Sequence, residues 1–498
     1  MTKAERRALV AALMTVTFLG ALDITIVTIA GPQIAQSLSG FDAIGFLFSA
    51  YTLAAAATIP VYGKLADLLG RKRMLTVGVA VFLAGSLLCG VAPSMAVLIA
   101  GRAVQGAGAG AVFTLVNTVI GDVFPVEARA KAMGVIGTVW GVASLVGPFA
   151  GGLLIDLLSW HWVFLVNLPL GLVALVLLHV SFKERYEPRR ASFDVAGAVA
   201  LTAAVTALLL SFNALAPDGG EARPTLWSGA PAAAVLALAA AAALAVFVIA
   251  ERRAADPIIP RSVNTRPAVV VNVVSFVASM VMMGSSVYLP VYFQDALHLS
   301  ATVSGLAFLP QSLAWLAMSF TLAPILIRFG ARRPLIALTG LMLAAYGLYC
   351  LLTPATPLLV AFAFVAFSGF GLGGVMNSAL IVIQESVETA NRGAAVGLNS
   401  MLRFVGQAIG AGVYGGVFNA ALAGFFTDRG VTGVDLGNPY AAVDTAPGVT
   451  AALVTEGFGA ALQTVFILLA ALTAVAFAAT WFMPKTAAGL GPDHSRQS

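Results

Sequence analysis

Charged residues and cysteines are scarce in this sequence. Lys, Arg, Asp and Glu together make up 10% of its 498 residues, whereas a soluble globular domain is typically about a quarter charged. The two cysteines, Cys89 and Cys350, lie near the ends of apolar stretches far apart in the chain, and we expect them to be free thiols that face lipid. The low charge excludes an ordinary water-soluble fold.

Histidine is also rare. The four histidines are His161, His179, His298 and His494. They are scattered along the chain and therefore indicate neither a metal cluster nor a His-based catalytic group. The glycine-rich stretch LIAGRAVQGAGAG (98–110) lacks the G-K-[ST] ending that nucleotide phosphates require. We therefore expect no metal, no cofactor and no ATP hydrolysis. A membrane-embedded enzyme or receptor is disfavoured, because no cluster of His, Asp or Ser marks one membrane face.

Hydrophobic residues are correspondingly abundant. They form 60% of the chain, with a mean hydropathy of +0.95, and only lipid can cover so much apolar surface. Fourteen stretches approach the roughly 20 residues that cross a hydrocarbon core, and they must be helical because lipid offers the backbone no hydrogen-bond partner. The sequence predicts an all-α integral membrane protein with 14 transmembrane helices. The stretches are 8–30, 44–63, 74–92, 95–118, 131–155, 160–181, 194–214, 229–250, 268–292, 302–327, 334–353, 357–383, 393–422 and 459–482.

Basic residues are distributed unevenly along the predicted loops. If the N-terminus is cytoplasmic, 23 of the 27 Lys and Arg fall in tails and loops on the inner side, as the positive-inside rule expects. Only Arg223 and Arg429 lie outside, and Arg102 and Arg403 lie within helices. We therefore predict that both termini are cytoplasmic. The first stretch is of spanning length and has no small-residue cleavage pattern before Pro32, so no cleavable signal is expected.

A pattern recurs at an offset of 260 residues. GKLADLLGRKRML (63–75) aligns with APILIRFGARRPL (323–335) when Gly70 is matched to Gly330, with Ile327 in place of Asp67. Two six-helix halves related in this way are a transporter architecture. The predicted organisation is an N-terminal bundle (8–181), linkers with two inserted helices (182–266), a C-terminal bundle (267–484) that contains an ordered outside loop (423–458), and a cytoplasmic tail (485–498).

Several motifs resemble those of the major facilitator superfamily. GKLADLLGRKRM (63–74) resembles the motif of the loop between helices 2 and 3, LIAGRAVQGAGAG (98–110) the helix 4 motif, and ASLVGPFAGG (143–152) the helix 5 motif of antiporters. Three more stretches are similar to the fourteen-spanner drug:proton antiporters: LDITIVTIAGP (22–32), FLVNLPLG (164–171) and FDVAG (193–197). Departures are Ala143, where glycine is usual, and Thr28 and Gly31, where Asn and Leu are common. The resemblance covers essentially the whole chain. It implies the major facilitator fold of two six-helix bundles, here with two inserted helices.

The loop at 63–74 combines turn glycines with opposite charges. Gly63 and Gly70 allow tight turns, and Asp67 beside Arg71 and Lys72 makes a charge cluster that can break and re-form as two bundles move. The resemblance implies that these residues form a conformational latch. The alternative for the basic residues is a loop that only sets topology.

The helix 5 motif places three glycines around a proline: Gly147, Pro148, Gly151 and Gly152. Small residues let helices approach closely in lipid, and proline permits a kink. One interpretation is close packing alone. The functional alternative is a flexing point that helps the outer gate to open and close.

Asp23 is the one charged residue between Arg7 and Asp42, in the middle of an apolar stretch. Charged groups at membrane depth are costly and usually face a cavity or a partner. Asp23 and Arg102 each lie eight residues from the outer end of their stretch, about 12 Å deep, so an ion pair is feasible. We predict that Asp23 carries a proton and that Arg102 tunes it. The alternative is a static pair that holds two helices together.

Arg403 lies about 15 Å into its stretch from the inner side, with no acid on the same stretch. It either binds backbone carbonyls or Gln311, or meets an anionic group of a substrate; Glu385 is a shallower alternative. For this architecture a substrate cavity is expected between the two halves near the midplane. Its candidate residues, each also compatible with helix packing, are Tyr51, Asn117, Trp140, Asn272, Phe276, Tyr288, Gln311, Trp315, Asn377, Asn399 and Arg403.

These features predict a proton-coupled antiporter that exports lipophilic, often cationic, drugs or antiseptics by alternating access. The alternative cargo is an endogenous metabolite, a lipid or an anionic antibiotic, which Arg403 favours. The energy source is the proton gradient, without a cofactor. The expected partners are a small-molecule substrate, protons and the lipid bilayer, with no nucleic acid. We expect a monomer in a bacterial plasma membrane, a location that suits the alanine-rich composition.

Overall fold

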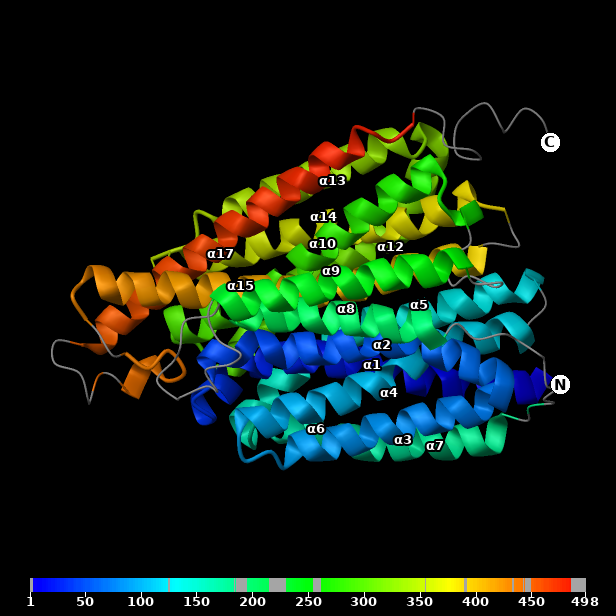
Figure 1. The fold of residues 1–498 in the computed structure, drawn as a ribbon, viewed down its shortest axis with the longest axis horizontal. Coiled ribbons are helices and arrows are strands. Elements are labelled where there is room, and N and C mark those ends of the chain that lie inside the picture. Colours follow the sequence, from blue (N-terminus) through cyan, green and yellow to red (C-terminus); the bar gives the residue numbers. More distant parts are fainter. Residues whose placement is uncertain are drawn as a thin grey trace. The chain divides into compact units, whose positions relative to one another are not determined.

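The computed structural model describes residues 3–123, 126–182, 184, 195–214, 230–253, 261–353, 355–388, 392–431, 434–441, 443 and 449–484. These residues are helical and contain no strand, which confirms the all-α prediction (Figure 1). The elements are α1 (Lys3–Ser37), η1 (Phe41–Ala43), α2 (Ile44–Leu69), α3 (Arg71–Gly90), α4 (Met95–Val123), α5 (Val126–Leu157), α6 (Trp162–Leu165), α7 (Asn167–Ser181), α8 (Val195–Ala214), α9 (Ala230–Arg253), η2 (Arg261–Val263), α10 (Arg266–Val291), η3 (Tyr292–Ala296), α11 (Ala301–Leu306), α12 (Leu309–Phe329), α13 (Arg332–Tyr349), α14 (Leu358–Ser386), α15 (Arg392–Asp428), η5 (Pro439–Ala441) and α17 (Ala451–Thr480).

Twelve spans among the described residues are long and apolar enough to cross a membrane. They include the α6–α7 pair and the α11–α12 pair, each counted as one span. The predicted stretches 194–214 and 334–353 correspond to α8 and α13, which are helical but do not belong to these twelve. The number 14 and the cytoplasmic position of the termini therefore remain predictions.

Several predicted boundaries differ from the structure. The stretch predicted to end at residue 292 continues from α10 into a π-helical turn, η3, that ends at Ala296. The last helix starts at Ala451 rather than 459, because Thr450 caps it: the Thr450 Oγ1 accepts a hydrogen bond from the Leu453 N–H at 3.2 Å. With α15 reaching Asp428, the loop predicted at 423–458 is shortened to 429–450.

The two corners of the predicted repeat adopt similar backbone conformations. Gly70 follows α2 with φ +93° and ψ 144°, and Gly330 follows α12 with φ +71° and ψ 176°. Both values lie in a region that residues with a side chain rarely enter. Each glycine ends one helix and lets the next begin within two residues, at Arg71 and Arg332.

The chain divides into two compact units. Unit 1 comprises residues 1–208, 236–256 and 300–305, and unit 2 comprises 209–235, 257–299 and 306–498. In unit 1, α1 packs against α5 and α7, and α4 packs against α2 and α3. In unit 2, α10 packs against α15 and α17, and α14 packs against α12 and α13. The domain boundaries predicted at 181 and 267 remain predictions.

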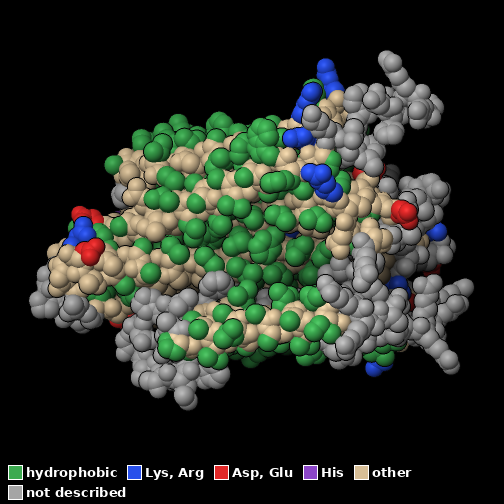
Figure 2. Space-filling view, turned by 45° about the horizontal axis from the view of Figure 1, so that its top comes forward, with side chains coloured by type: hydrophobic (Ala, Val, Ile, Leu, Met, Phe, Trp, Pro, Cys, Tyr) green, Lys and Arg blue, Asp and Glu red, His purple; other side chains and the backbone are tan. Residues whose placement is uncertain are grey.

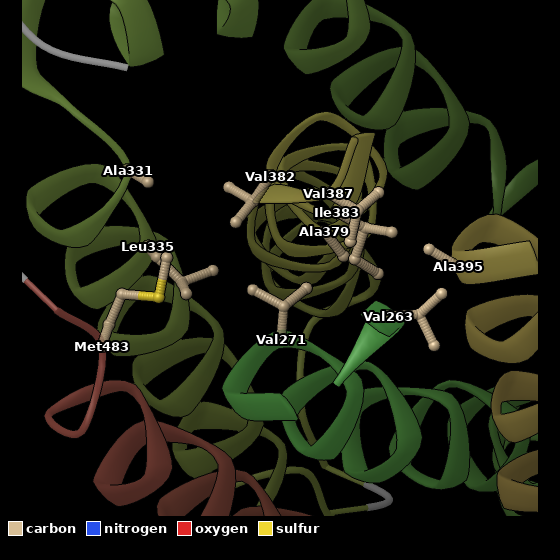
Figure 3. Packing of buried hydrophobic residues seen from close by; sticks show 10 residues of the cluster. All are labelled: Val263, Val271, Ala331, Leu335, Ala379, Val382, Ile383, Val387, Ala395 and Met483. Carbon is tan, nitrogen blue, oxygen red and sulfur yellow. The ribbon is translucent and has the colours of Figure 1, made fainter. Parts of the chain in front are cut away.

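Apolar side chains form both the interior and much of the surface. Figure 3 shows one cluster in unit 2, where Leu335 of α13 lies beside Met483 and Val271 of α10 faces the α14 residues Ala379 and Ile383. Figure 2 shows hydrophobic side chains over the visible helices, with charged side chains at their ends. Exposed apolar surface of this extent is what a protein surrounded by lipid requires.

Candidate functional site

Asp23 lies in the interior of unit 1 and is fully buried. Its carboxylate accepts three hydrogen bonds from side chains. The Arg102 Nη1 donates to Oδ2 at 2.8 Å, and Oδ1 accepts from the Gln105 Nε2 at 2.7 Å and from the Asn167 Nδ2 at 2.8 Å. The structure thus brings the two predicted coupling residues, Asp23 and Arg102, into an ion pair.

A second set of contacts holds these donors in place. The Ser86 Oγ on α3 accepts from both the Gln105 Nε2 (2.7 Å) and the Asn167 Nδ2 (2.9 Å). Arg102 also donates from Nη1 to the Gln105 Oε1 at 2.7 Å and from Nε to the Leu47 carbonyl at 3.3 Å. The five polar side chains therefore form one connected network contributed by α1, α3, α4 and α7.

Glycines allow the helices of this network to approach. A Cβ at Gly85 would collide with the backbone of Gln105, and one at Gly106 would collide with the carbonyl of Tyr51. Asn167 begins α7 directly after the break at Val166, and Pro169 in the first turn supplies no backbone donor, so it fits this position without loss. The close packing of α2, α3 and α4 thus depends on small residues at defined positions.

Aromatic and apolar groups seal the network. The Arg102 Cζ lies 4.1 Å from the ring centroid of Tyr51 and 5.9 Å from that of Phe164. The Tyr51 hydroxyl has no hydrogen-bond partner in the described part of the chain. Cys89 is fully buried, with its Sγ 4.0 Å from the Gln105 Oε1. The prediction that Cys89 faces lipid is therefore wrong, because tight α3–α4 packing encloses it.

The neighbours of the Asp23 carboxylate compensate its charge. All three groups that contact the carboxylate donate to it, and one of them is a cation. Removing either charge would leave the other buried without compensation, which is costly.

Sequence reasoning did not assign a role to Gln105, Ser86 or Asn167. Gln105 and Asn167 stand within quoted motifs, and all three are polar residues in otherwise apolar stretches. That scarcity was the available signal. Their convergence on one carboxylate depends on which faces of α3, α4 and α7 meet, and no local pattern reports this.

The helix 5 motif lies against two partners within unit 1. A Cβ at Gly147 would collide with the Thr25 side chain of α1, and one at Gly152 would collide with the carbonyl of Ala301. At the end of α5, the Asp156 carboxylate accepts from the backbone N–H groups of Ala301 (3.3 Å) and Thr302 (2.8 Å). The Gly151 and Pro148 positions likewise contact Ile26 and Gly305. This is close packing; the predicted gating role remains a prediction.

The predicted latch contains an acid that the sequence analysis did not consider. The Glu184 carboxylate accepts from the backbone N–H of Arg71 at 2.7 Å and of Lys72 at 2.9 Å, at the start of α3, where a negative charge complements the helix dipole. The Lys72 Nζ donates to the His179 carbonyl at 2.9 Å. Gly63 lies within α2, and the Asp67 side chain is outside the described part of the structure.

The predicted cavity residues occupy different surroundings. In unit 2, the Asn399 Nδ2 donates to the Asn272 Oδ1 at 3.0 Å, and the Asn377 Nδ2 donates to the Ser319 Oγ at 2.9 Å. Tyr288 is buried with its ring 5.2 Å from that of Phe418. Four others lie at contacts between helices: Phe276 against Gly406, Gln311 against Gly369, Trp315 against Gly373, and Trp140 with its ring 5.8 Å from that of Phe113. The side chain of Asn117 is outside the described part of the structure.

Arg403 lies on α15, one turn after Asn399. Its Nε is buried and has no hydrogen-bond partner, and the guanidinium forms no ion pair with any residue that the structure describes. No contact with Gln311 is present in that part of the chain. The two predicted explanations for Arg403, structural bonds or a substrate anion, therefore stay open.

Comparison with known proteins agrees with this architecture. Residues 13–411 match the family model of the Major Facilitator Superfamily. The multidrug transporter protein MdtP of Bacillus subtilis (strain 168) is 33% identical over 87% of this chain and 79% of its own, and the multidrug efflux pump SdrM of Staphylococcus aureus (strain N315) is 27% identical over 84% and 90%.

Among solved structures, a bacterial homologue of the human lysosomal transporter Spinster, in an inward-facing and unoccupied conformation, matches with a TM-score of 0.69. The match covers 97% of this chain and 98% of that one at 16% identity, and so supports the fold alone. Because the family model covers most of the chain and its motifs lie on the expected helices, the chain belongs to the Major Facilitator Superfamily of multi-pass membrane transporters.

Proposed function

We propose that this protein is a proton-coupled antiporter of a bacterial plasma membrane. It exports lipophilic, often cationic, drugs or antiseptics in exchange for external protons, by alternating access and with the N-terminus in the cytoplasm. The identity with multidrug transporters supports the efflux activity. The single observation that supports proton coupling is the buried carboxylate of Asp23 in its ion pair with Arg102.

In this proposal Asp23 alternates between two states. In the ionised state it keeps the three hydrogen bonds described above. When a proton reaches Oδ2, the attraction of Arg102 is lost, while Gln105 and Asn167 still donate to Oδ1. Arg102 retains the Gln105 Oε1, the Leu47 carbonyl and the Tyr51 ring as partners. The released cation is thus not stranded, and the cost of protonation stays moderate.

The test is transport in vesicles that contain purified full-length protein. An inward proton gradient is imposed, and movement of a fluorescent lipophilic cation is compared between the wild type and Asp23→Asn. The wild type should concentrate the cation at the expense of the gradient, whereas the variant should only equilibrate it. Full coupling in Asp23→Asn would refute the role of Asp23. No response of either protein to the gradient would refute the proposed cargo.

Asp428→Asn is the matched control, because it makes the same chemical change at an exposed acid at the end of α15. It should leave coupling unchanged. A loss of coupling in both variants would mean that the assay reports general damage, and the proposal would then lack support from Asp23→Asn.

A second candidate cargo is an anionic compound, an endogenous metabolite or a lipid. The observation in its favour is Arg403, whose buried Nε has no hydrogen-bond partner and which forms no ion pair with a described residue. Competition between cationic and anionic compounds for transport distinguishes the two cargoes. Inhibition by anions that is lost in Arg403→Gln and kept in Arg332→Gln, at an exposed helix start, would favour the anionic cargo.

A further inference from the structure

A second carboxyl group is buried in unit 2, where sequence reasoning placed a loop. Asp295 lies in η3, the π-helical turn that extends α10, and is only 8% exposed. The wide turn is closed by the Leu297 N–H, which donates to the Tyr292 carbonyl at 3.1 Å, and the Leu299 N–H donates to the Phe293 carbonyl at 3.0 Å. Such turns recur at functional sites because they redirect a side chain.

The Asp295 carboxyl has no counter-charge among the residues described. Its Oδ2 is inaccessible to solvent and has no hydrogen-bond partner there, and Asp295 forms no ion pair in that part of the chain. The start of α17, which packs against η3, contributes buried apolar side chains such as Val454 and Phe458. An ionised carboxylate in these surroundings is costly, whereas a neutral carboxylic acid is tolerated. The closed arrangement therefore suits a carboxyl that holds a proton.

Tyr440 belongs to η5 (Pro439–Ala441), in the loop between α15 and α17, and contacts Asp295. Its hydroxyl lies 3.5 Å from the Asp295 carbonyl oxygen, and its ring stacks on Phe458 with centroids 5.6 Å apart. Burial and the adjacent Asp295 carboxyl raise the pKa of Tyr440, so its hydroxyl remains a donor at ordinary pH. The residues Pro439–Ala441, here named the Tyr440 segment, thus close the turn off from solvent.

Four other titratable or charged groups near this turn have partners of their own among the described residues. The Tyr292 hydroxyl donates to the Thr353 carbonyl at 2.8 Å, and the His298 Nε2 lies 3.3 Å from the Thr455 Oγ1. Arg429, directly after α15, and Glu456 of α17 are exposed and pair with each other at 4.0 Å. None of these forms an ion pair with Asp295, so the group available to neutralise it is a proton.

We propose that Asp295 is a second proton-binding site, and that the Tyr440 segment controls exchange of this proton with water. While Asp295 is protonated, the segment stays closed. When the carboxyl O–H bond breaks and a water molecule takes the proton, the carboxylate must be hydrated, and the Tyr440 segment is displaced. In the exporter proposed above, on which this consequence rests, each unit would then contribute one proton site.

Infrared spectroscopy of the purified full-length protein tests the site without any transport. Protonated carboxyl groups absorb at a C=O stretching frequency separate from that of carboxylates, and the band is followed as the pH is raised stepwise. We expect a buried carboxyl band at neutral pH that is lost in Asp295→Asn and retained in Asp23→Asn and Asp428→Asn. Retention of the whole band in a monodisperse Asp295→Asn variant would overturn the proposal.

Tyr440→Phe tests the control by the segment. Loss of the hydroxyl should shift the frequency of the Asp295 band and the pH at which it disappears, whereas Asp435→Asn, elsewhere in the same loop, should leave both unchanged. If Tyr440→Phe changes neither quantity, the controlling role of the segment is wrong.

The vesicle assay then separates this proposal from the proposed function. Gradient-driven transport should persist in Asp295→Asn. The curve of its rate against the pH on the side of the Tyr440 segment should lack one of the titration steps that the wild type shows. An unchanged pH profile would overturn a role of Asp295 in transport. If no variant and not even the wild type is driven by protons, the proposed function fails, while the infrared result still decides whether Asp295 binds a proton.

Discussion

The two units differ in whether the charged groups inside them form an ion pair. In unit 1, the acid Asp23 and the base Arg102 pair directly, and Gln105, Asn167 and Ser86 satisfy the remaining bonds. In unit 2, the base Arg403 and the acid Asp295 lie on different helices and share no ion pair. Asp23 and Arg102 of unit 1 thus compensate each other, whereas neither Asp295 nor Arg403 forms an ion pair with a described residue of unit 2.

These two kinds of buried group should respond differently to mutation. A buried pair is strongly affected when one member is removed, because the other is left uncompensated. An unpaired buried group loses nothing of that kind when it is made neutral. Stability measurements can therefore distinguish the two kinds of site before any substrate is known.

The largest expected effect concerns Arg102, compared with Arg403. Arg102→Leu should destabilise the protein by about 3–5 kcal/mol, because it strands the Asp23 carboxylate in an apolar interior. Arg403→Leu should cost far less or stabilise, since no described partner is lost. Denaturant titration in detergent measures both, and the double variant Asp23→Asn with Arg102→Leu should recover part of the loss. Equal losses for the two arginines would remove the contrast between the units.

The repeated corners allow a comparison at a smaller scale. Gly70→Ala and Gly330→Ala should each cost about 1–3 kcal/mol, because both positions have backbone angles reserved for glycine. The cost at Gly70 should be the larger, since the following N–H groups also bind Glu184. Thermal unfolding of the two variants checks the order. Gly416→Ala, where an added Cβ meets nothing within 4 Å, is the control and should be nearly neutral.

The smallest expected effect is at the neutral pair in unit 2. A double-mutant cycle of Asn272→Ala and Asn399→Ala should give a coupling energy of about 0.6 kcal/mol, as is typical of hydrogen bonds between membrane helices. The same cycle for Asn167→Ala and Asp23→Asn should give a larger value, because its acceptor is charged. If the coupling energy of the Asn272–Asn399 pair equals that of the Asn167–Asp23 pair, the polar contact in unit 2 stabilises the protein as much as the one in unit 1.

Much of the architecture could be predicted from composition and motifs. The apolar stretches and the requirement for helices in lipid predicted the all-α membrane fold, and the motifs predicted the family, which the comparisons confirm. Depth along two stretches was enough to suggest that Asp23 could meet Arg102. The number of 14 membrane crossings stays a prediction, because α8 and α13 are helical but do not belong to the twelve spans found among the described residues.

Other features could not be read from local patterns. Asp295 follows a stretch that ends on hydropathy grounds at residue 292, and it is buried only because α10 winds on through a π-helical turn and Tyr440 returns from a distant loop. Glu184 follows α7 and belongs to none of the quoted motifs, yet its carboxylate accepts hydrogen bonds from the first two N–H groups of α3.

The sequence by itself determined that the chain is helical and surrounded by lipid, since hydropathy and the hydrogen-bonding needs of the backbone act along the chain. It also determined the family, because the motifs are contiguous. The tertiary structure alone decided which polar groups are compensated. Gln105, Ser86 and Asn167 meet at Asp23 because glycines let α3 and α4 approach, whereas Asp295 meets no cation in the described residues. Compensation of a buried charge depends on distances between helices, and these are set by packing rather than by the order of residues.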